Sequence, residues 1–276
     1  MKDIAIEIKN NISNLSWMLD SLKYNKNSAQ FFYDNYTIYN NITSIDVSSF
    51  NLNFLIFINP YVKYTLSPFI DKLSILDKQT RVIKFGLLFR ELNSVGLNIR
   101  DYLVSFRNLI FSNFFDSFSY SQKSIILYRM NFDDIEFFSI NKNSTAEPFV
   151  GENFLNIVKY NNISNVIVLN RNDGIFYIND NKIIDIKYTS GWVNIPVYRI
   201  LLTKVVNFVL DKNKTLEELN KEMLDIIDNM PPEDMFGYDE CQISKAFKST
   251  DITPRAVKNL FISNIMSKFV MLINRI

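Results

Sequence analysis

The segment from Asn161 to Thr189 constrains the fold more strongly than any other part of the sequence. Three short apolar runs, NVIVL, IFYI and KIIDIKY, alternate with the turn sequences RNDG and NDN. Asp, Asn and Gly tolerate the positive φ angles of tight hairpin turns, and each apolar run has the length of a strand. We therefore predict a three-stranded antiparallel β-meander around residues 161–189.

Several longer segments have apolar residues at every third or fourth position, which is the spacing of an amphipathic helix. This spacing predicts one helix over 3–24 and two or three helices over 68–118. It also predicts C-terminal helices near 194–211, 215–229, 239–248 and 254–275. Thr215 and Glu218 match a capping box, in which each side chain bonds the free amide of the other residue.

The region between the first two helical segments is different. Residues 36–66 contain short apolar runs that favour two or three strands. Together these segments predict an α+β protein, mainly helical, with a small antiparallel sheet.

A polar stretch near residue 150 suggests a division into a helical region with a small β segment (1–150) and a β-meander followed by helices (151–276). A single domain is the alternative.

The chain has no histidine, although it carries 24 Phe and 14 Tyr. Histidine titrates near neutral pH and is the commonest metal ligand. Its absence excludes Ser-His and Cys-His nucleophilic catalysis, RNA cleavage by a histidine acid–base pair and most zinc sites. The glycine-rich phosphate-binding motifs of P-loop and Rossmann enzymes are also missing. Most familiar catalytic classes are therefore excluded.

The composition also bears on the source and location of the protein. Asn, Ile, Lys, Phe and Tyr are used heavily, while Gly (6), Pro (7) and Trp (2) are scarce, as an AT-rich coding sequence favours. We expect a virus, a phage, a plasmid-like element or a host with similar bias. The single Cys241 cannot form an intrachain disulfide, and we see neither a signal peptide nor a spanning apolar run. The expected location is cytoplasmic, without a membrane partner.

Two carboxylates and a lysine fall on the predicted meander. Asp173 lies in its first turn, Asp185 and Lys187 lie two residues apart on its third strand, and Glu152 lies upstream. This layout resembles the PD-(D/E)xK nuclease superfamily, although Asn172 replaces the superfamily's proline. The resemblance implies carboxylates that hold Mg²⁺ and a lysine that orients or activates water. A solvated turn and an exposed strand explain the same residues without catalysis.

A second acidic group consists of Asp133, Asp134 and Glu136. Three carboxylates within four residues could bind Mg²⁺ or Ca²⁺, but the glycine and the alternating oxygen ligands of an EF-hand loop are missing. We predict a solvated turn between Phe132 and Phe137 and no metal site.

The formal net charge of +1 conceals a separation of charge along the chain. Residues 63–107 carry eight Lys or Arg and four acids, whereas residues 217–240 carry nine acids and one Lys. The basic stretch could contact nucleic-acid phosphates, and the acidic stretch suits a basic protein partner or another copy of the chain. The alternative is that both are ordinary solvated helix faces. The candidate binding residues are Arg81, Lys84, Arg90, Glu217, Glu218 and Asp234.

These features favour a non-enzymatic protein that binds other proteins, because catalytic signatures are missing and interfaces prefer aromatic side chains. A viral or phage assembly component and an immunity protein that neutralises a toxin both fit. The first alternative is the Mg²⁺-dependent nuclease, and the second is a nucleic-acid-binding module that uses residues 63–107. No cofactor is expected outside the nuclease alternative.

Overall fold

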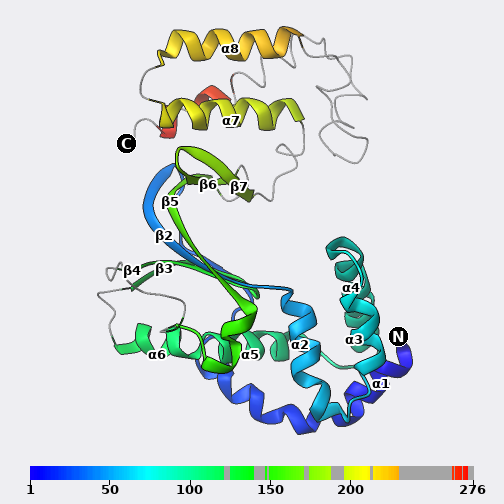
Figure 1. Ribbon diagram of the computed structural model, residues 1–276. Helices are drawn as coiled ribbons and strands as arrows, with labels where there is room; N and C mark the ends of the chain where they lie inside the picture. Colours follow the sequence, from blue (N-terminus) through cyan, green and yellow to red (C-terminus); the bar gives the residue numbers. More distant parts are fainter. Residues whose placement is uncertain are drawn as a thin grey trace. The chain divides into compact units, whose positions relative to one another are not determined.

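The chain folds into two compact units, each built from segments that are separate in the sequence. Unit 1 contains Met1–Phe32 and Thr43–Asn162, and unit 2 contains Tyr33–Ile42 and Ile163–Ile276. The computed structural model describes residues 1–120, 125–139, 147, 149–170, 174–187, 196–211, 214–229, 263, 265–268 and 270–272 (Figure 1). The division expected at residue 150 differs from this partition because two long strands, β2 and β5, run through both units.

Helices dominate unit 1. They are α1 (Lys2–Asn11), η1 (Ile12–Lys23), α2 (Phe50–Ile58), η2 (Asn59–Val62), α3 (Ser67–Ser74), α4 (Lys78–Ser94), α5 (Arg100–Ile110), α6 (Ser112–Tyr120) and η3 (Glu152–Ile157). The predicted N-terminal helix is present, but its second half, η1, is a 3₁₀ helix. The helical segment predicted over 68–118 begins with α3, which has Pro68 in its first turn.

The strands are β1 (Gln30–Phe31), β2 (Thr37–Val47), β3 (Ile125–Met130), β4 (Asp134–Ser139), β5 (Val158–Asn170), β6 (Gly174–Asn179) and β7 (Lys182–Lys187). They follow the hydrogen-bonded order β1-β3-β4-β2-β5-β6-β7 in a curled antiparallel sheet (Figure 1). The α+β class predicted from the sequence is therefore confirmed.

Unit 2 contains the predicted meander, formed by β5, β6 and β7. Asp180 and Asn181 in the β6–β7 turn have φ angles of 50° and 59°, the left-handed conformation expected of this turn. Helices α7 (Pro196–Leu210) and α8 (Leu216–Asn229) lie side by side and bury their apolar faces in the core of this unit (Figure 1). The helix predicted near 239–248 lies outside the described residues, and that near 254–275 is described only in short helical pieces.

Residues 50–58 form the helix α2, not the strand that their apolar run predicts. Phe50, Phe54, Leu55 and Ile58 are all buried, so α2 is covered on more than one side. A short apolar run without periodicity fits a buried helix as well as a buried strand. Here tertiary packing selected the helix.

Aromatic rings fill the core of unit 1. The centroid of the Phe106 ring on α5 lies 5.1 to 5.8 Å from those of Phe50, Phe54, Phe57 and Phe154. Such tilted and edge-to-face pairs add to the free energy gained by burying the rings. These rings join α2, α5 and η3 in the core of unit 1.

The acidic group on β4 is buried, and the prediction of a solvated turn is wrong for two of its three members. Asp134 and Glu136 side chains are 5% and 0% exposed. The Arg129 guanidinium on β3 donates to both, and its bond to Asp134 Oδ2 is 2.6 Å long. Only Asp133 is exposed. Strand pairing explains the difference, because Arg129 lies opposite Glu136 in the β3–β4 register.

Replacing Arg129 with Met should destabilise the chain strongly, because it leaves two buried carboxylates without their cation. Breaking a buried ion pair from one side costs about 3 to 5 kcal/mol of unfolding free energy. Urea unfolding of purified wild-type and variant chains measures the difference. The matched control is Arg90→Met, at an exposed arginine, which should change the free energy by less than about 0.5 kcal/mol. A loss below about 1 kcal/mol for Arg129→Met would contradict the assigned pairing.

Candidate functional site

Helix α4 is held firmly within unit 1. At its start, Asp77 accepts hydrogen bonds from the hydroxyl of Thr80 (2.6 Å) and from its backbone N–H (3.0 Å). These bonds lower the pKa of Asp77, so the cap is charged at neutral pH. Phe85, Leu88 and Leu92 are buried in the core, and α1 packs alongside α4 (Figure 1). The outer side of α4 is thus presented on a rigid support.

That outer side combines apolar and basic residues. We define the α4 face as Val82, Ile83, Lys84, Gly86 and Arg90, all of which are exposed. Val82 and Ile83 are 56% and 57% exposed. Ile83, Gly86 and Arg90 are spaced by three and four residues, so they follow one side of the helix. Two aliphatic side chains and two cations are therefore open to solvent on this helix.

The two cations of the α4 face have no polar partner among the described residues. Neither Lys84 nor Arg90 forms a hydrogen bond, an ion pair or a cation–π contact with the part of the chain that the structure describes. Their charges are thus available to a ligand or a partner. Both were predicted as binding residues from the sequence, and both are accessible as that prediction requires.

Because Gly86 has no side chain, no atoms project from the helix at the centre of the α4 face. A Cβ atom built at this position has no heavy atom within 4 Å, so the space above it is open. Glycine inside a helix costs roughly 0.5 to 1 kcal/mol relative to alanine, and nothing in the described structure requires it here. An open glycine between exposed aliphatic residues lets the backbone of a partner approach α4 closely.

Arg81, the third predicted cation, lies in a pocket at the start of α4. The pocket has a volume of about 290 Å³, and its charged lining residues are Lys78, Arg81, Lys159, Asp46 and Asp133. Arg81 is only half-exposed, unlike the cations of the α4 face. Because three cations and two acids line this pocket, it has little excess charge.

Arg107 belongs to the basic stretch in sequence but is not available for binding. Its side chain is fully buried on α5 and donates hydrogen bonds to the carbonyl oxygen of Asn27 (2.7 Å) and to Oδ1 of Asn108 (2.9 Å). Burial lowers the pKa of its guanidinium to about 10, so it stays charged at neutral pH. Its role is to hold the loop after η1 against α5.

The predicted acidic residues lie on α8 where they are described. Glu217 is exposed in the first turn. Glu218 completes the predicted capping box, since its Oε2 accepts from the Thr215 N–H (2.8 Å) and its own N–H donates to Thr215 Oγ1 (3.3 Å). The capping box is confirmed, and the role of Glu218 is to cap the start of α8. Asp234 lies outside the described residues.

The residues of the nuclease alternative are only partly described. Asp185 and Lys187 share one side of β7, but the Lys187 ammonium lies 5.0 Å from the centre of the Tyr177 ring. Glu152 is exposed on η3 in unit 1, and Asp173 lies outside the described residues. Within the described part of the chain, no three acidic or cysteine side chains gather into a group that could hold a metal ion.

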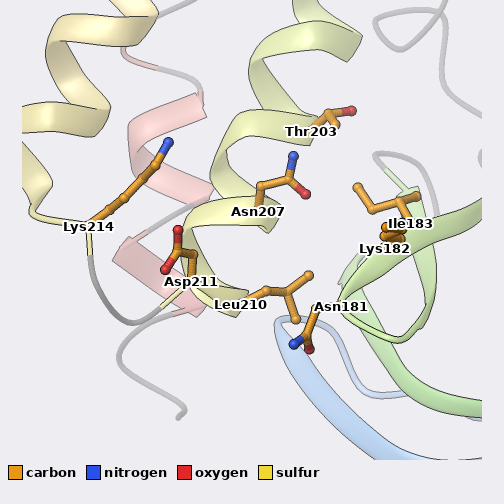
Figure 2. A pocket seen from close by; sticks show the side chains of 8 residues that line it. All are labelled: Asn181, Lys182, Ile183, Thr203, Asn207, Leu210, Asp211 and Lys214. Atoms are coloured by element: carbon orange, nitrogen blue, oxygen red, sulfur yellow. The ribbon is translucent and has the colours of Figure 1, made fainter.

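A second pocket lies inside unit 2, between α7 and the β6–β7 turn, with a volume of about 700 Å³ (Figure 2). Asn207 of α7 and Asn181 of the turn line it, and neither side chain has a polar partner among the described residues. Lys214 points away from the pocket (Figure 2), and its ammonium bonds Glu222 at 2.8 Å. Lys182 and Asp211, also in the lining, carry opposite charges. This pocket is wide and close to neutral.

The sequence reasoning missed the apolar part of the α4 face. Val82 and Ile83 lie on the solvent side of α4, while Phe85 and Leu88 occupy its core side. A helix with apolar residues on both sides cannot bury them all against one layer. This excess was visible in the sequence and could have identified the face.

Comparisons with known proteins leave the family of the chain open. No protein-family model matches the sequence, and no curated protein matches it. One solved structure, the family B DNA polymerase from the hyperthermophilic archaeon Pyrobaculum calidifontis, aligns with 76% of this chain at 12% identity and a TM-score of 0.33. The alignment spans 36% of the polymerase chain, about a third of its length. A TM-score this low does not establish a shared fold.

None of the helices in the described part of the chain is both long enough and apolar enough to cross a membrane. This agrees with the absence of a spanning run in the sequence.

Incubation with Mg²⁺ or Mn²⁺ and mixed DNA and RNA should produce no cleavage above that of a metal-free control. We expect this because the Lys187 ammonium packs on Tyr177 and no described acid cluster holds a metal. Gel electrophoresis of the substrates measures it. Metal-dependent cleavage that disappears in the Lys187→Ala variant would instead support the nuclease alternative.

Proposed function

We propose that this chain is a non-enzymatic protein-binding protein, and that the α4 face is its binding surface. The single observation that carries the proposal is the exposure of Val82 and Ile83 on the same helix as Lys84 and Arg90, two cations without a polar partner among the described residues. The partner is a protein segment with acidic and apolar side chains. Assembly of a virus or phage, or neutralisation of a toxin, would each use such a surface in an AT-rich element.

The chemistry of the face supports a protein partner. Burying the exposed halves of Val82 and Ile83 would contribute on the order of 1 kcal/mol each. The two cations would add selectivity for an acidic partner and speed its encounter. An exposed isoleucine at position 75, 84% exposed in the turn before α4, extends the apolar area toward the start of the helix.

Nucleic acid suits the face less well. Binding to phosphates rests on many cations, and single-stranded nucleic acid also needs aromatic side chains on which bases stack. The α4 face offers two cations, two aliphatic side chains and no aromatic ring. Arg107 belongs to the basic stretch 63–107 in the sequence, but its side chain is buried and cannot contact a phosphate.

The proposal is tested by placing a photoreactive amino acid at Ile83 in the full chain, expressed in its native cells. Irradiation should give a discrete crosslink to protein, and Lys84→Glu with Arg90→Glu should remove it because the acidic partner is repelled. Denaturing gels and mass spectrometry identify the product. The matched control carries the same probe at Ile184, which is 54% exposed on β7.

The outcomes separate the functional classes. Equal crosslinking from positions 83 and 184, or no protein crosslink at position 83, would count against the proposal. Crosslinks to nucleic acid that weaken steeply with salt would support the nucleic-acid-binding alternative instead.

Gly86→Ala should stabilise the chain and at the same time weaken partner binding. The stability gain is about 0.5 to 1 kcal/mol, because alanine favours the helix and its Cβ meets no neighbour. The same methyl group fills the space through which a partner would approach. Urea unfolding and the crosslink yield from position 83 measure the two effects.

Asn10→Ala on α1 is the control for this substitution. Asn10 is exposed and lies on another helix, so its replacement also raises helix propensity without touching the α4 face. It should leave the crosslink yield unchanged. An unchanged yield in Gly86→Ala would show that close approach at this glycine is not needed.

A further inference from the structure

We infer that the acidic partner of the α4 face is helix α8 of a second copy of this chain, a step that rests on the proposed function. The chain would then assemble through two different surfaces, one on each unit. Charge complementarity and a shared pattern of exposed aliphatic residues connect the two helices.

Helix α8 carries acids and two exposed leucines, Leu216 (55% exposed) and Leu224. We define the α8 face as Glu217, Lys221, Leu224 and Asp225, all exposed. Leu224 is 39% exposed, while Leu219, Met223 and Ile227 on the other side of the helix are buried. Glu217 lies seven residues before Leu224, so it follows the same side of the helix. The charged residues of this face therefore sum to −1 around an apolar centre.

The two faces complement each other. On α4, Val82 and Ile83 lie beside Lys84 and Arg90, and the face contains no acid. On α8, Leu224 is next to Asp225 and two turns from Glu217, with Lys221 between them. Neither of these two acids has a polar partner among the described residues, just as the two cations of α4 have none. Packing the helices together would pair opposite charges around a small apolar centre that Gly86 leaves accessible.

Other acids of α8 are already engaged inside unit 2. Glu222 bonds Lys214 at 2.8 Å and lies 3.4 Å from Lys204. Its pKa is lowered, first by the hydrogen bond from Lys214, so it is satisfied without a partner chain. Glu218 caps the helix start. The acids of the α8 face, Glu217 and Asp225, lack a described partner, which leaves them available to an interface.

The contact is heterologous, because the α4 face of one copy meets the α8 face of another. Such a contact produces rings when the rotation between copies closes and open chains when it does not. Each copy keeps one free α4 face and one free α8 face until the assembly closes. Self-association should therefore continue beyond an isolated pair as concentration rises.

The experiment is sedimentation velocity of the purified full chain over a range of concentrations at low and high salt. The wild type should sediment faster as concentration rises, and less so at high salt because screening weakens the charge pairs. Lys84→Glu with Arg90→Glu should weaken association by at least about tenfold, and so should Glu217→Lys with Asp225→Lys. Combining all four substitutions exchanges the charges of the two faces and should restore association.

The matched control for net charge is Lys26→Glu with Lys182→Glu, two exposed cations outside both faces. This variant should associate like the wild type. Urea unfolding of every variant verifies that the fold is kept. A wild type that stays monomeric at all concentrations overturns the inference, as does unchanged association in either face variant. Failure of the fourfold exchange to restore association overturns the assignment of α8.

Failure of this inference is distinguishable from failure of the proposed function. If the purified chain stays monomeric while the probe at Ile83 crosslinks a different protein in cells, the α4 face binds proteins but not its own chain. If the probe crosslinks only a second copy, both statements are supported. If neither association nor a protein crosslink occurs, both fail.

Discussion

The burial of Phe106 among phenyl rings is the interaction on which unit 1 depends. Its ring contacts residues of α2 and η3, so one side chain of α5 joins segments that are about 50 residues away on either side in the sequence. The next two residues of α5, Arg107 and Asn108, hold the loop after η1 through backbone carbonyls. Because α5 is buried along most of its length, the helices around it have little freedom to shift.

This central position of α5 leaves α4 at the periphery. Helix α4 contacts the core through Phe85, Leu88 and Leu92, and its opposite side faces solvent although it carries Val82 and Ile83. A stable cap at Asp77 and a buried inner side keep that surface in place without a partner. The exposed aliphatic residues are therefore a property of a well-supported helix.

Charge has opposite roles in different parts of the molecule. Arg129, Asp134 and Glu136 lie inside unit 1, where removing one partner of a buried ion pair is costly. Lys84 and Arg90 lie on the surface, where they contribute little to stability and can select a partner. Nothing in the local sequence separates these groups, because acids and bases occur in both. Strand register and helix packing assigned them to the interior or to the surface.

The sequence by itself determined the local structure wherever the signal was local. Turn residues predicted the β5–β7 meander, Thr215 and Glu218 predicted the start of α8, and apolar periodicity predicted most described helices. It also predicted Lys84 and Arg90 as candidate binding residues. Tertiary structure alone decided that residues 50–58 are helical and that Asp134 and Glu136 are buried. The physical reason is that burial depends on which residues distant in sequence pack against a segment, and periodicity does not contain that information.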